Sequence, residues 1–331
     1  MYNILFTNAG RRATLLNDFK ESLGNQVKII ATDNWCVAPA LFVADQYYLS
    51  PKITDKNYIS FLLEICKKEK VDVITSLIDP EIELLAKNRE LFLKNGVLPL
   101  VPELGTAQLC YDKYKMYEYL LQHNINTINT YESIDKFKEA LKNGNIDFPV
   151  FVKPRTGSGS VGAQKVNDMK SLETLINENK FEYIIQEFMN GEDFDADVYV
   201  DVISREVVAA FSKKKIETRI GGASKTISFK DNQLFDFIKK IVGCFDFYGP
   251  IDLDFFYRDG RYYLSEINPR FGGAYLHAYG AGVDFPKMIA NNIDHKVNDI
   301  QIGKYEDDVL MIMYDDVIIT KKSELRGDYN D

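Results

Sequence analysis

Two alternating runs of apolar and polar residues, joined by the Asp259-Gly260 pair, constrain the fold of this chain more than any other feature. An Asp-Gly pair between two such runs is a strong signal for a tight β-hairpin. Side chains on a strand alternate between its two faces. We therefore expect Asp252 and Asp254 to share a face of the first strand, and Glu266 and Asn268 to share a face of the second.

If the strands pair with these faces on the same side, three carboxylates and one amide converge. Like charges this close together are costly unless a cation neutralises them. Hard oxygen ligands suit Mg²⁺, which proteins bind through one or two carboxylates together with substrate phosphates. Arg270 lies two residues after Asn268 and could add positive charge to the same face. The alternative interpretation is a solvated acidic hairpin without a function.

A glycine-rich loop between two short strands is the second motif. Phe148–Lys153 and Ala163–Val166 have the composition of strands, and TGSGSVG at residues 156–162 joins them. Such a loop can wrap backbone N–H groups around an anion. It is neither a dinucleotide fingerprint, because a strand follows it, nor a Walker A loop, because no Gly-Lys-Ser/Thr closes it. We interpret it as a flap over phosphates, with Lys153 as a point charge beside them; a flexible surface hairpin is the alternative.

Residues 1–112 alternate between strand and helix patterns. Four apolar runs predict the strands: Tyr2–Thr7, Val27–Thr32, Val71–Ser76 and Val97–Val101. This alternation predicts a parallel sheet with helices on both faces, and ligands at the carboxyl ends of its strands. Arg11 and Arg12 follow the first strand, where they could bind a carboxylate or phosphate or simply begin a helix at the surface. The first turn has only Gly10, which disfavours a nicotinamide-binding domain.

The chain resembles the ATP-grasp superfamily in three segments, taken in order: FVKPRTGSGSVG, IIQEFMNGEDFDADVYV and DLDFFYRDGRYYLSEINPRFGG. The branch it resembles is that of stand-alone proteins similar to one synthetase half of the carbamoyl-phosphate synthase large subunit. The resemblance implies an α/β fold in three parts. These are a Rossmann-like, pre-ATP-grasp parallel-sheet domain at 1–112, a small α/β lid subdomain with the flap at 113–190, and a C-terminal mixed-sheet subdomain with the metal hairpin at 191–331.

The resemblance also implies a reaction. A carboxylate is activated by ATP as an acyl phosphate, an amine attacks it to form an amide, and ADP is released. Asp254, Glu266 and Asn268 would hold Mg²⁺, for which Mn²⁺ could substitute. Asp252 is the weaker candidate, because the family's ligand directly precedes an aromatic residue, as Asp254 does. Lys153 and Arg270 would be the catalytic residues that neutralise developing charge.

The resemblance assigns nucleotide contacts to further residues. They are Lys113, Lys153, the flap residues Gly157, Ser158, Gly159, Ser160, Val161 and Gly162, and the adenine-binding segment Glu187, Phe188 and Met189. Asp193 would bind the ribose hydroxyl groups, with Glu192 as the alternative.

Two later runs supply candidate substrate residues. Arg219 lies in the run Glu217–Lys225, whose glycine pair between basic residues predicts a mobile loop that closes over substrate. A solvated basic loop is an equal alternative. His277 follows Arg270 in a run rich in glycine and aromatic residues, although a lone histidine more often serves packing. The candidate substrate residues are therefore Arg11, Arg12, Arg219 and His277.

Composition excludes several classes of protein. A net charge of −9 argues against a nucleic-acid partner. No stretch of about 18 apolar residues predicts a membrane span, and the N-terminus lacks a signal-peptide pattern. We expect a cytoplasmic enzyme that acts on small carboxylates and amines and that could form a homodimer. The open alternatives are one half of a carbamoyl-phosphate-synthase-type enzyme and a non-catalytic nucleotide-binding module.

Overall fold

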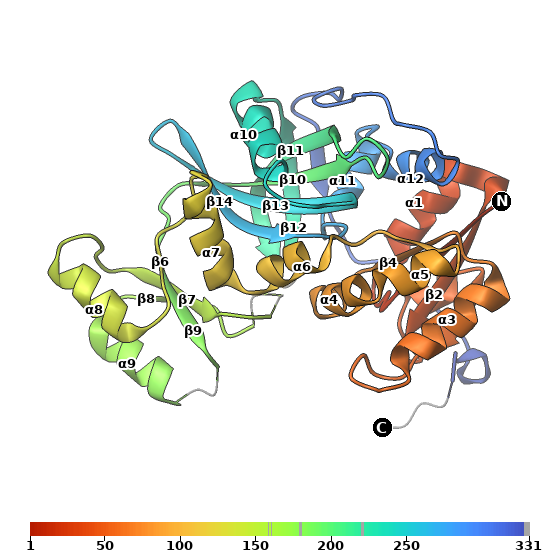
Figure 1. Ribbon diagram of the computed structural model, residues 1–331, viewed down its shortest axis with the longest axis horizontal. Helices are drawn as coiled ribbons and strands as arrows, with labels where there is room; N and C mark the ends of the chain where they lie inside the picture. Colours follow the sequence, from red (N-terminus) through yellow and green to blue (C-terminus); the bar gives the residue numbers. More distant parts are fainter. Residues whose placement is uncertain (158, 160, 179–180, 220–221, 328–331) are drawn as a thin grey trace.

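The computed structural model describes residues 1–157, 159, 161–178, 181–219 and 222–327. Of the candidate site residues, Ser158 and Ser160 lie outside the described residues. The described chain folds around three sheets (Figure 1). The four-stranded sheet lies at the left of Figure 1, the five-stranded sheet at the right, and the six-stranded sheet between and above them.

The N-terminal sheet is parallel, with strand order β3-β2-β1-β4-β5. On β1, Ile4 and Phe6 belong to one apolar cluster and Leu5 to another, so both faces are covered. This confirms the predicted Rossmann-like architecture, to which β3 is an addition. The elements are β1 (Tyr2–Thr7), α1 (Ala13–Leu23), η1 (Gly24–Gln26), β2 (Val27–Asp33), α2 (Ala40–Val43), β3 (Gln46–Leu49), α3 (Tyr58–Glu69), β4 (Val73–Ser76), α4 (Asp79–Lys87), α5 (Arg89–Lys94), β5 (Leu98–Pro99) and α6 (Leu104–Tyr111).

The small sheet is antiparallel, with order β6-β9-β7-β8, and β7 and β8 are the two predicted flap strands. Phe137 of α8 and Leu172 of α9 pack onto Val150 and Val152 of β7, which gives this sheet a core of its own. The elements are α7 (Lys113–Gln122), β6 (Thr130–Tyr131), α8 (Ile134–Lys142), β7 (Val150–Pro154), β8 (Gln164–Val166), α9 (Met169–Glu178) and β9 (Tyr183–Glu187).

Helix α7 connects the outer sheets. Its N-cap is Asp112, whose side chain accepts hydrogen bonds from the Tyr114 and Lys115 N–H groups. Met116 and Leu120 of α7 belong to the large core that contains the six-stranded sheet, rather than to the core of the small sheet. The helix therefore holds Lys113, at its first position, close to the six-stranded sheet.

The six-stranded sheet has order β14-β13-β10-β11-β12-β15, and all its pairs are antiparallel. Apolar residues such as Ala196, Val198, Leu253 and Phe255 pack beneath it in the large core. The elements are β10 (Glu192–Val200), β11 (Val207–Arg219), β12 (Gly222–Phe229), α10 (Asn232–Val242), β13 (Gly249–Arg258), β14 (Arg261–Asn268), α11 (Tyr275–Gly280), α12 (Phe285–Ile293), β15 (Leu310–Ile312) and η2 (Lys322–Glu324).

The predicted mobile loop at Glu217–Lys225 is wrong for the described residues. Strand β11 continues to Arg219 and β12 begins at Gly222, so most of the run belongs to a long hairpin. Residues 220–221 lie outside the described residues. A strand can contain positively charged residues when residues on the neighbouring strand pair with them. Here Glu217 lies opposite Lys225 across the hairpin and accepts a hydrogen bond from it.

Candidate active site

The predicted metal ligands lie on one face of the β13–β14 hairpin. Asp252 is opposite Asn268, and Asp254 is opposite Glu266. Because side chains alternate along each strand, all four point to the same side. The Asn268 Nδ2 atom lies 3.3 Å from Asp254 Oδ2 and 3.2 Å from Asp252 Oδ2. The condition for convergence, that the two faces lie on the same side, is therefore met, and a β-bulge between Asp254 and Phe255 sets the register that meets it.

Two lysines contact this group of oxygens. The Lys215 Nζ atom, from β11, lies 2.5 Å from Asp254 Oδ1. The Lys113 Nζ atom donates to the carbonyl of Gly157 at 2.6 Å and lies 3.6 Å from Glu266 Oε1. Burial raises the pKa of Asp254, and the Lys215 ammonium opposes that rise. In this structure ammonium groups therefore supply the positive charge that the carboxylates require.

The donor set fits a divalent cation. Asp254 and Glu266 offer two carboxylates, and Asn268 adds an amide whose Nδ2 atom faces the acids while its Oδ1 atom accepts from Arg270. Rotation of the amide by half a turn would present its oxygen, and these are ligands that Mg²⁺ accepts. The Glu266 side chain is 31% exposed, so this group is open on one side to further ligands such as phosphate oxygens. We find the residues suitable for Mg²⁺, with Asp252 lying deeper in the protein. We call the face formed by Asp254, Glu266 and Asn268 the metal face.

Lys153 lies on β7, next to the flap, and is almost fully buried. Burial lowers the pKa of its ammonium, while the nearby Glu266 carboxylate works in the opposite direction. A buried cation beside the metal face is suited to an anionic ligand, which would offset its desolvation. The phosphate contact of Lys153 stays a prediction.

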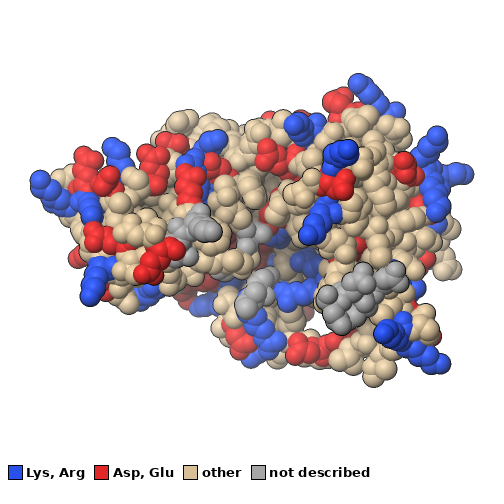
Figure 2. Space-filling model, turned by 90° about the horizontal axis from the view of Figure 1, so that it is seen from below, with Lys and Arg blue, Asp and Glu red and all other residues tan. Residues whose placement is uncertain are grey.

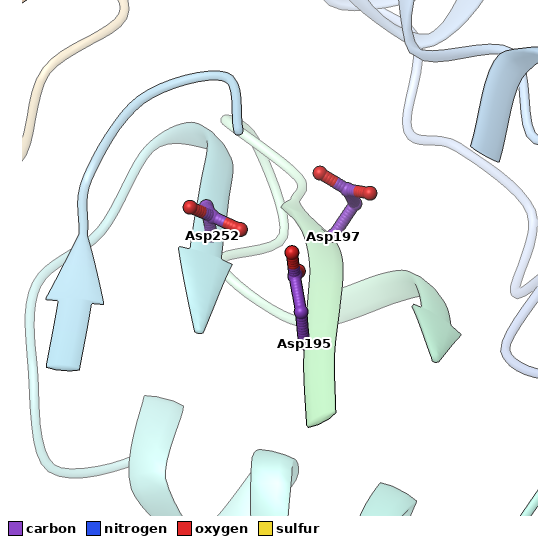
Figure 3. Close-up of side chains that lie close together, drawn as sticks. All are labelled: Asp195, Asp197 and Asp252. Atoms are coloured by element: carbon purple, nitrogen blue, oxygen red, sulfur yellow. The ribbon is translucent and has the colours of Figure 1, made fainter. Parts of the chain in front are cut away.

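Two further acids form a buried group with Asp252 next to the metal face. Asp195 and Asp197 of β10 lie beside Asp252 of β13, with carboxylate oxygens within 4.8 Å of one another (Figure 3). The Lys213 Nζ atom lies 3.0 Å from Asp195 Oδ1 and also contacts Asp197. Lys213 is completely buried. We call these four residues the buried ionic cluster, in which the Lys213 ammonium balances the charge of the acids.

The loop after β14 packs directly onto the buried ionic cluster. A Cβ atom added at Gly272 would lie 2.7 Å from Asp252 Oδ1 and 2.8 Å from Asp197 Oδ1. Only glycine therefore fits there without displacement of a carboxylate. The Gly272 carbonyl accepts a hydrogen bond from Arg12 Nη2 at 2.6 Å. Arg12 thus ties the N-terminal domain to this loop.

Arg12 and Arg270 lie on either side of the Phe271 carbonyl. It accepts from Arg270 Nη1 at 3.0 Å and from Arg12 Nη2 at 3.4 Å. Burial and the neighbouring Arg270 lower the pKa of Arg12 to about 10. Two adjacent guanidinium groups favour an anion beside them. The substrate role of Arg12 and the catalytic role of Arg270 stay predictions.

The other candidate residues are less closely grouped. Asp193 forms an ion pair with Lys215 at 2.8 Å, next to the metal face. The Glu187 N–H donates to the Asn129 carbonyl, and its side chain contacts Arg258. Phe188 lies under the Lys165 ammonium, and Met189 is buried. The nucleotide roles of these residues remain predictions.

Two of the candidate substrate residues stand apart from the metal face. Arg219 is half-exposed and lies near Glu217 and Asp315. His277 is buried, contacts Thr226 through Nδ1 at 2.7 Å, and packs edge-on against Phe211. Burial lowers the pKa of His277 to about 4. Its surroundings are those of a packing residue.

The surface of the molecule has a hollow near its middle. Seen from below, Lys and Arg atoms are visible inside this hollow (Figure 2). Cations gathered in a concave place attract anionic ligands, although the whole chain is acidic.

Sequence reasoning missed four residues of this charged face: Lys213, Lys215, Asp195 and Asp197. The alternation in DFDADVYVD and in the basic run before Glu217 carried a signal, since residues two apart share a face. Their pairing with the metal hairpin was not predictable locally, because β10 and β13 are far apart in the chain.

Comparison with known families agrees with this architecture. The N-terminal part, residues 4–100, matches the family described as PylC-like, N-terminal domain. Residues 110–274 match the family described as ATP-grasp domain. The second match contains the flap, the metal hairpin and the loop after it.

Similar proteins span most of the chain. A D-alanine–D-alanine ligase from a Nitratiruptor species is 25% identical over 275 residues, which cover 77% of this chain and 78% of the ligase. The arginine-specific carbamoyl phosphate synthase large chain of Bacillus subtilis is 21% identical over 76% of this chain but only 25% of its own length.

Solved structures share the fold. The biotin carboxylase domain of Hydrogenobacter thermophilus 2-oxoglutarate carboxylase, a dimer in complex with MgADP, ADP and bicarbonate, has a TM-score of 0.74 and 16% identity. The similarity covers 93% of this chain and 73% of that one. The predicted fold and superfamily are confirmed: this chain belongs to the ATP-grasp family and carries a PylC-like domain ahead of its ATP-grasp domain.

Proposed function

We propose that this protein is an ATP- and Mg²⁺-dependent ligase that activates a carboxylate as an acyl phosphate, releases ADP and joins the acyl group to an amine. The observation that carries the proposal is the shared face of Asp254, Glu266 and Asn268, with Lys113 and Lys215 against it. Oxygen ligands surrounded by cations suit a metal–polyphosphate complex.

The polyphosphate of ATP would lie between the flap and the metal face. Lys113 already joins the Gly157 carbonyl of the flap to Glu266, and buried Lys153 lies at the base of the flap. Both ammonium groups would turn to phosphate oxygens. Mg²⁺, when bound by Asp254, Glu266 and Asn268, would neutralise charge on the β- and γ-phosphates; Mn²⁺ would be a substitute for it.

The substrate carboxylate would be oriented by the loop that follows β14. Arg270 and Arg12 hold their guanidinium groups beside the metal face through the Phe271 carbonyl. A carboxylate oxygen placed there attacks the γ-phosphorus, and the P–O bond to ADP breaks. An amine nitrogen then attacks the acyl carbon, phosphate leaves, and a proton passes to solvent. Positioning and charge neutralisation by these residues carry the catalysis.

The closed flap would exclude water from the acyl phosphate. No nucleophilic side chain is needed, because the carboxylate itself is the nucleophile toward ATP. Arg11 and Arg219 remain candidates for contacts with the rest of the substrate, and the buried His277 is the weaker candidate. A homodimer and a cytoplasmic setting remain part of the proposal. Among the described residues, no helix has the length and apolar character of a membrane span.

The reaction can be tested with purified protein, MgATP and pools of small carboxylates and amines. The proposal expects ADP release that requires one member of each pool, and an amide product of the corresponding mass. ADP release with bicarbonate and ammonia alone, with carbamoyl phosphate as product, would favour the alternative of a carbamoyl-phosphate-synthase half. MgATP binding without turnover in any pool would favour the non-catalytic module.

A further inference from the structure

One contact at the proposed site joins two domains. Asp79, at the first position of α4, lies against Arg270 of the loop after β14. The Arg270 Nη2 atom donates to Asp79 Oδ2 at 2.8 Å, and Nε lies 2.8 Å from Oδ1. The two side chains are only 15% and 14% exposed. The Asp79 carboxylate thus faces the Nε–Nη2 edge of Arg270. The proposed function places a substrate carboxylate beside the same arginine.

We propose that the Nε–Nη2 edge of Arg270 is the docking place of the substrate carboxylate, and that Asp79 is a built-in competitor for it. The inference rests on the proposed function. To that function the inference adds a subsite for one carboxylate group at one edge of Arg270, and it names Asp79 as the residue that must move away before this group can bind.

The number of donors on Arg270 supports a competition. A guanidinium group has five N–H donors. Nη2 donates to Asp79 and, at 3.2 Å, to Asn268 Oδ1, while Nη1 donates to the Phe271 carbonyl. The Nε–Nη2 edge is the one that could hold a carboxylate with two parallel hydrogen bonds. A substrate carboxylate can take that geometry only if Asp79 moves away.

The contact is also poorly aligned for a paired carboxylate. Although Nε and Oδ1 are 2.8 Å apart, neither atom has a partner with the direction that a hydrogen bond requires. A hydrogen bond weakens steeply as its angle closes. A free carboxylate can rotate to align both oxygens, whereas Asp79 is fixed to its helix. The substrate group therefore has a geometric advantage over Asp79.

The position of this edge suits the reaction. Through Nη2, Arg270 contacts Asn268, a proposed metal ligand, so a carboxylate held there lies next to the metal face. Asp79, Glu266, Asn268 and Gly157 are among the residues that line a small pocket here, which has room for about one water molecule while Asp79 is in place. The Arg12 guanidinium lies on the far side of the Phe271 carbonyl and adds positive charge.

Displacement of Asp79 need not leave an uncompensated charge. Asp79 is in the first turn of α4, a helix of nine residues. A carboxylate is stabilised at such a helix N-terminus by the backbone N–H groups and the helix dipole. Burial opposes the charge on Arg270, and Asp79 raises its pKa; an incoming carboxylate would take over that role.

The test is the affinity for acetate, the probe for a carboxylate group, measured by broadening of its NMR methyl signal. Four proteins are compared: wild type, Asp79→Asn, the double variant Asp79→Asn/Arg270→Gln, and Glu83→Gln, which removes a carboxylate elsewhere on α4. Thermal unfolding checks that each is folded. Asp79→Ser replaces Asp79→Asn if the latter is unstable.

We expect Asp79→Asn to bind acetate about 5- to 20-fold more tightly, because removal of a competitor shifts the binding equilibrium. Glu83→Gln should stay within about twofold of wild type, and the double variant should lose the gain. Unchanged or weaker binding in Asp79→Asn would overturn the proposal. So would a gain that survives Arg270→Gln, because it would reflect general charge. The measurement needs no turnover, so it can fail or succeed independently of the ligase assay.

Discussion

Two groups of acidic residues lie side by side on the same face of the six-stranded sheet, and they differ in which cation balances them. In the buried ionic cluster, Lys213 contacts Asp195 and Asp197, and its side chain is 0% exposed. At the metal face, Lys215 and Lys113 contact Asp254 and Glu266, and each lysine side chain is 12% exposed.

The difference in accessibility separates a structural group from a functional one. A fully buried ammonium group cannot turn away to a ligand without leaving buried carboxylates uncompensated, so its role is to stabilise the folded state. Ammonium groups at an open edge can turn to phosphate when a divalent cation takes their place beside the carboxylates. We propose that the same chemistry serves stability in one group and ligand binding in the other.

The largest expected effect is on the metal face. Glu266→Gln keeps the shape of the side chain but removes its charge, and we expect turnover to fall about 10²–10³-fold because charge stabilisation in the transition state is lost. The midpoint of thermal unfolding should stay near that of wild type. Steady-state ADP release and calorimetric unfolding measure the two. Retained turnover would contradict the assignment; Glu64→Gln, at an exposed position of α3, is the matched control.

The next effect distinguishes Lys213 from Lys215, which share a face of β11. Lys213→Met should lower the free energy of unfolding by about 3–5 kcal/mol, because it leaves buried carboxylates unpaired. Lys215→Met should cost clearly less stability, since its partners have access to solvent, yet weaken MgATP binding. Urea unfolding of both variants decides between them. Equal losses of stability would remove the distinction between the two groups.

A pH effect follows from His277, which lies near Lys213. Burial first, and then the Lys213 charge, lower the pKa of His277 from 6.5 to about 4. The folded state therefore favours the neutral ring. The contribution of His277 to the free energy of unfolding is complete above pH 6.5 and is lost as the pH falls toward 4. The shift corresponds to about 3 kcal/mol at most.

We therefore expect His277→Gln to flatten the loss of unfolding free energy between pH 6.5 and 4. Urea unfolding at a series of pH values measures it, with exposed His295→Gln as the control. An unchanged acid limb in His277→Gln would mean that folding does not lower the pKa of this histidine.

The smallest effect concerns the contact between the loop and the buried ionic cluster. Gly272→Ala adds a Cβ atom 2.7 Å from Asp252 Oδ1. The crowding should lower the unfolding free energy, measured by urea unfolding, by about 1–3 kcal/mol. Gly105→Ala, where a Cβ atom meets nothing within 4 Å, is the control. A stability equal to wild type in Gly272→Ala would show that the loop is not held by the cluster.

The sequence allowed prediction of what depends on local pattern. The Asp259-Gly260 turn was enough to predict the hairpin, but a β-bulge between Asp254 and Phe255 shifts the register by one residue and brings Asp254 opposite Glu266, which the alternation alone did not predict. The alternation of strands and helices predicted the parallel sheet. Glycines and basic residues around Arg219 suggested a loop, but long-range pairing made them the end of a hairpin.

Contacts between segments that are distant in the chain could not be predicted from the sequence. Asp79 and Arg270 are 191 residues apart in the chain, and their contact depends on how two domains pack. Lys215 meets Asp254 because β10 lies between β11 and β13, an order that no local signal specifies. The chemistry of a site can thus be recognised in one segment, while its counter-charges come from others.

The central claim is that the metal face binds a magnesium–nucleotide complex, and calorimetric titration of ATP tests it most directly. With Mg²⁺ in excess, we predict saturable binding at one site, lost or weakened about 10–100-fold in Lys153→Ala because a buried phosphate contact is removed. The same titration with a chelator present should give far weaker binding. If ATP gave no heat of binding in excess Mg²⁺, or bound Lys153→Ala and wild type alike, the account would be contradicted.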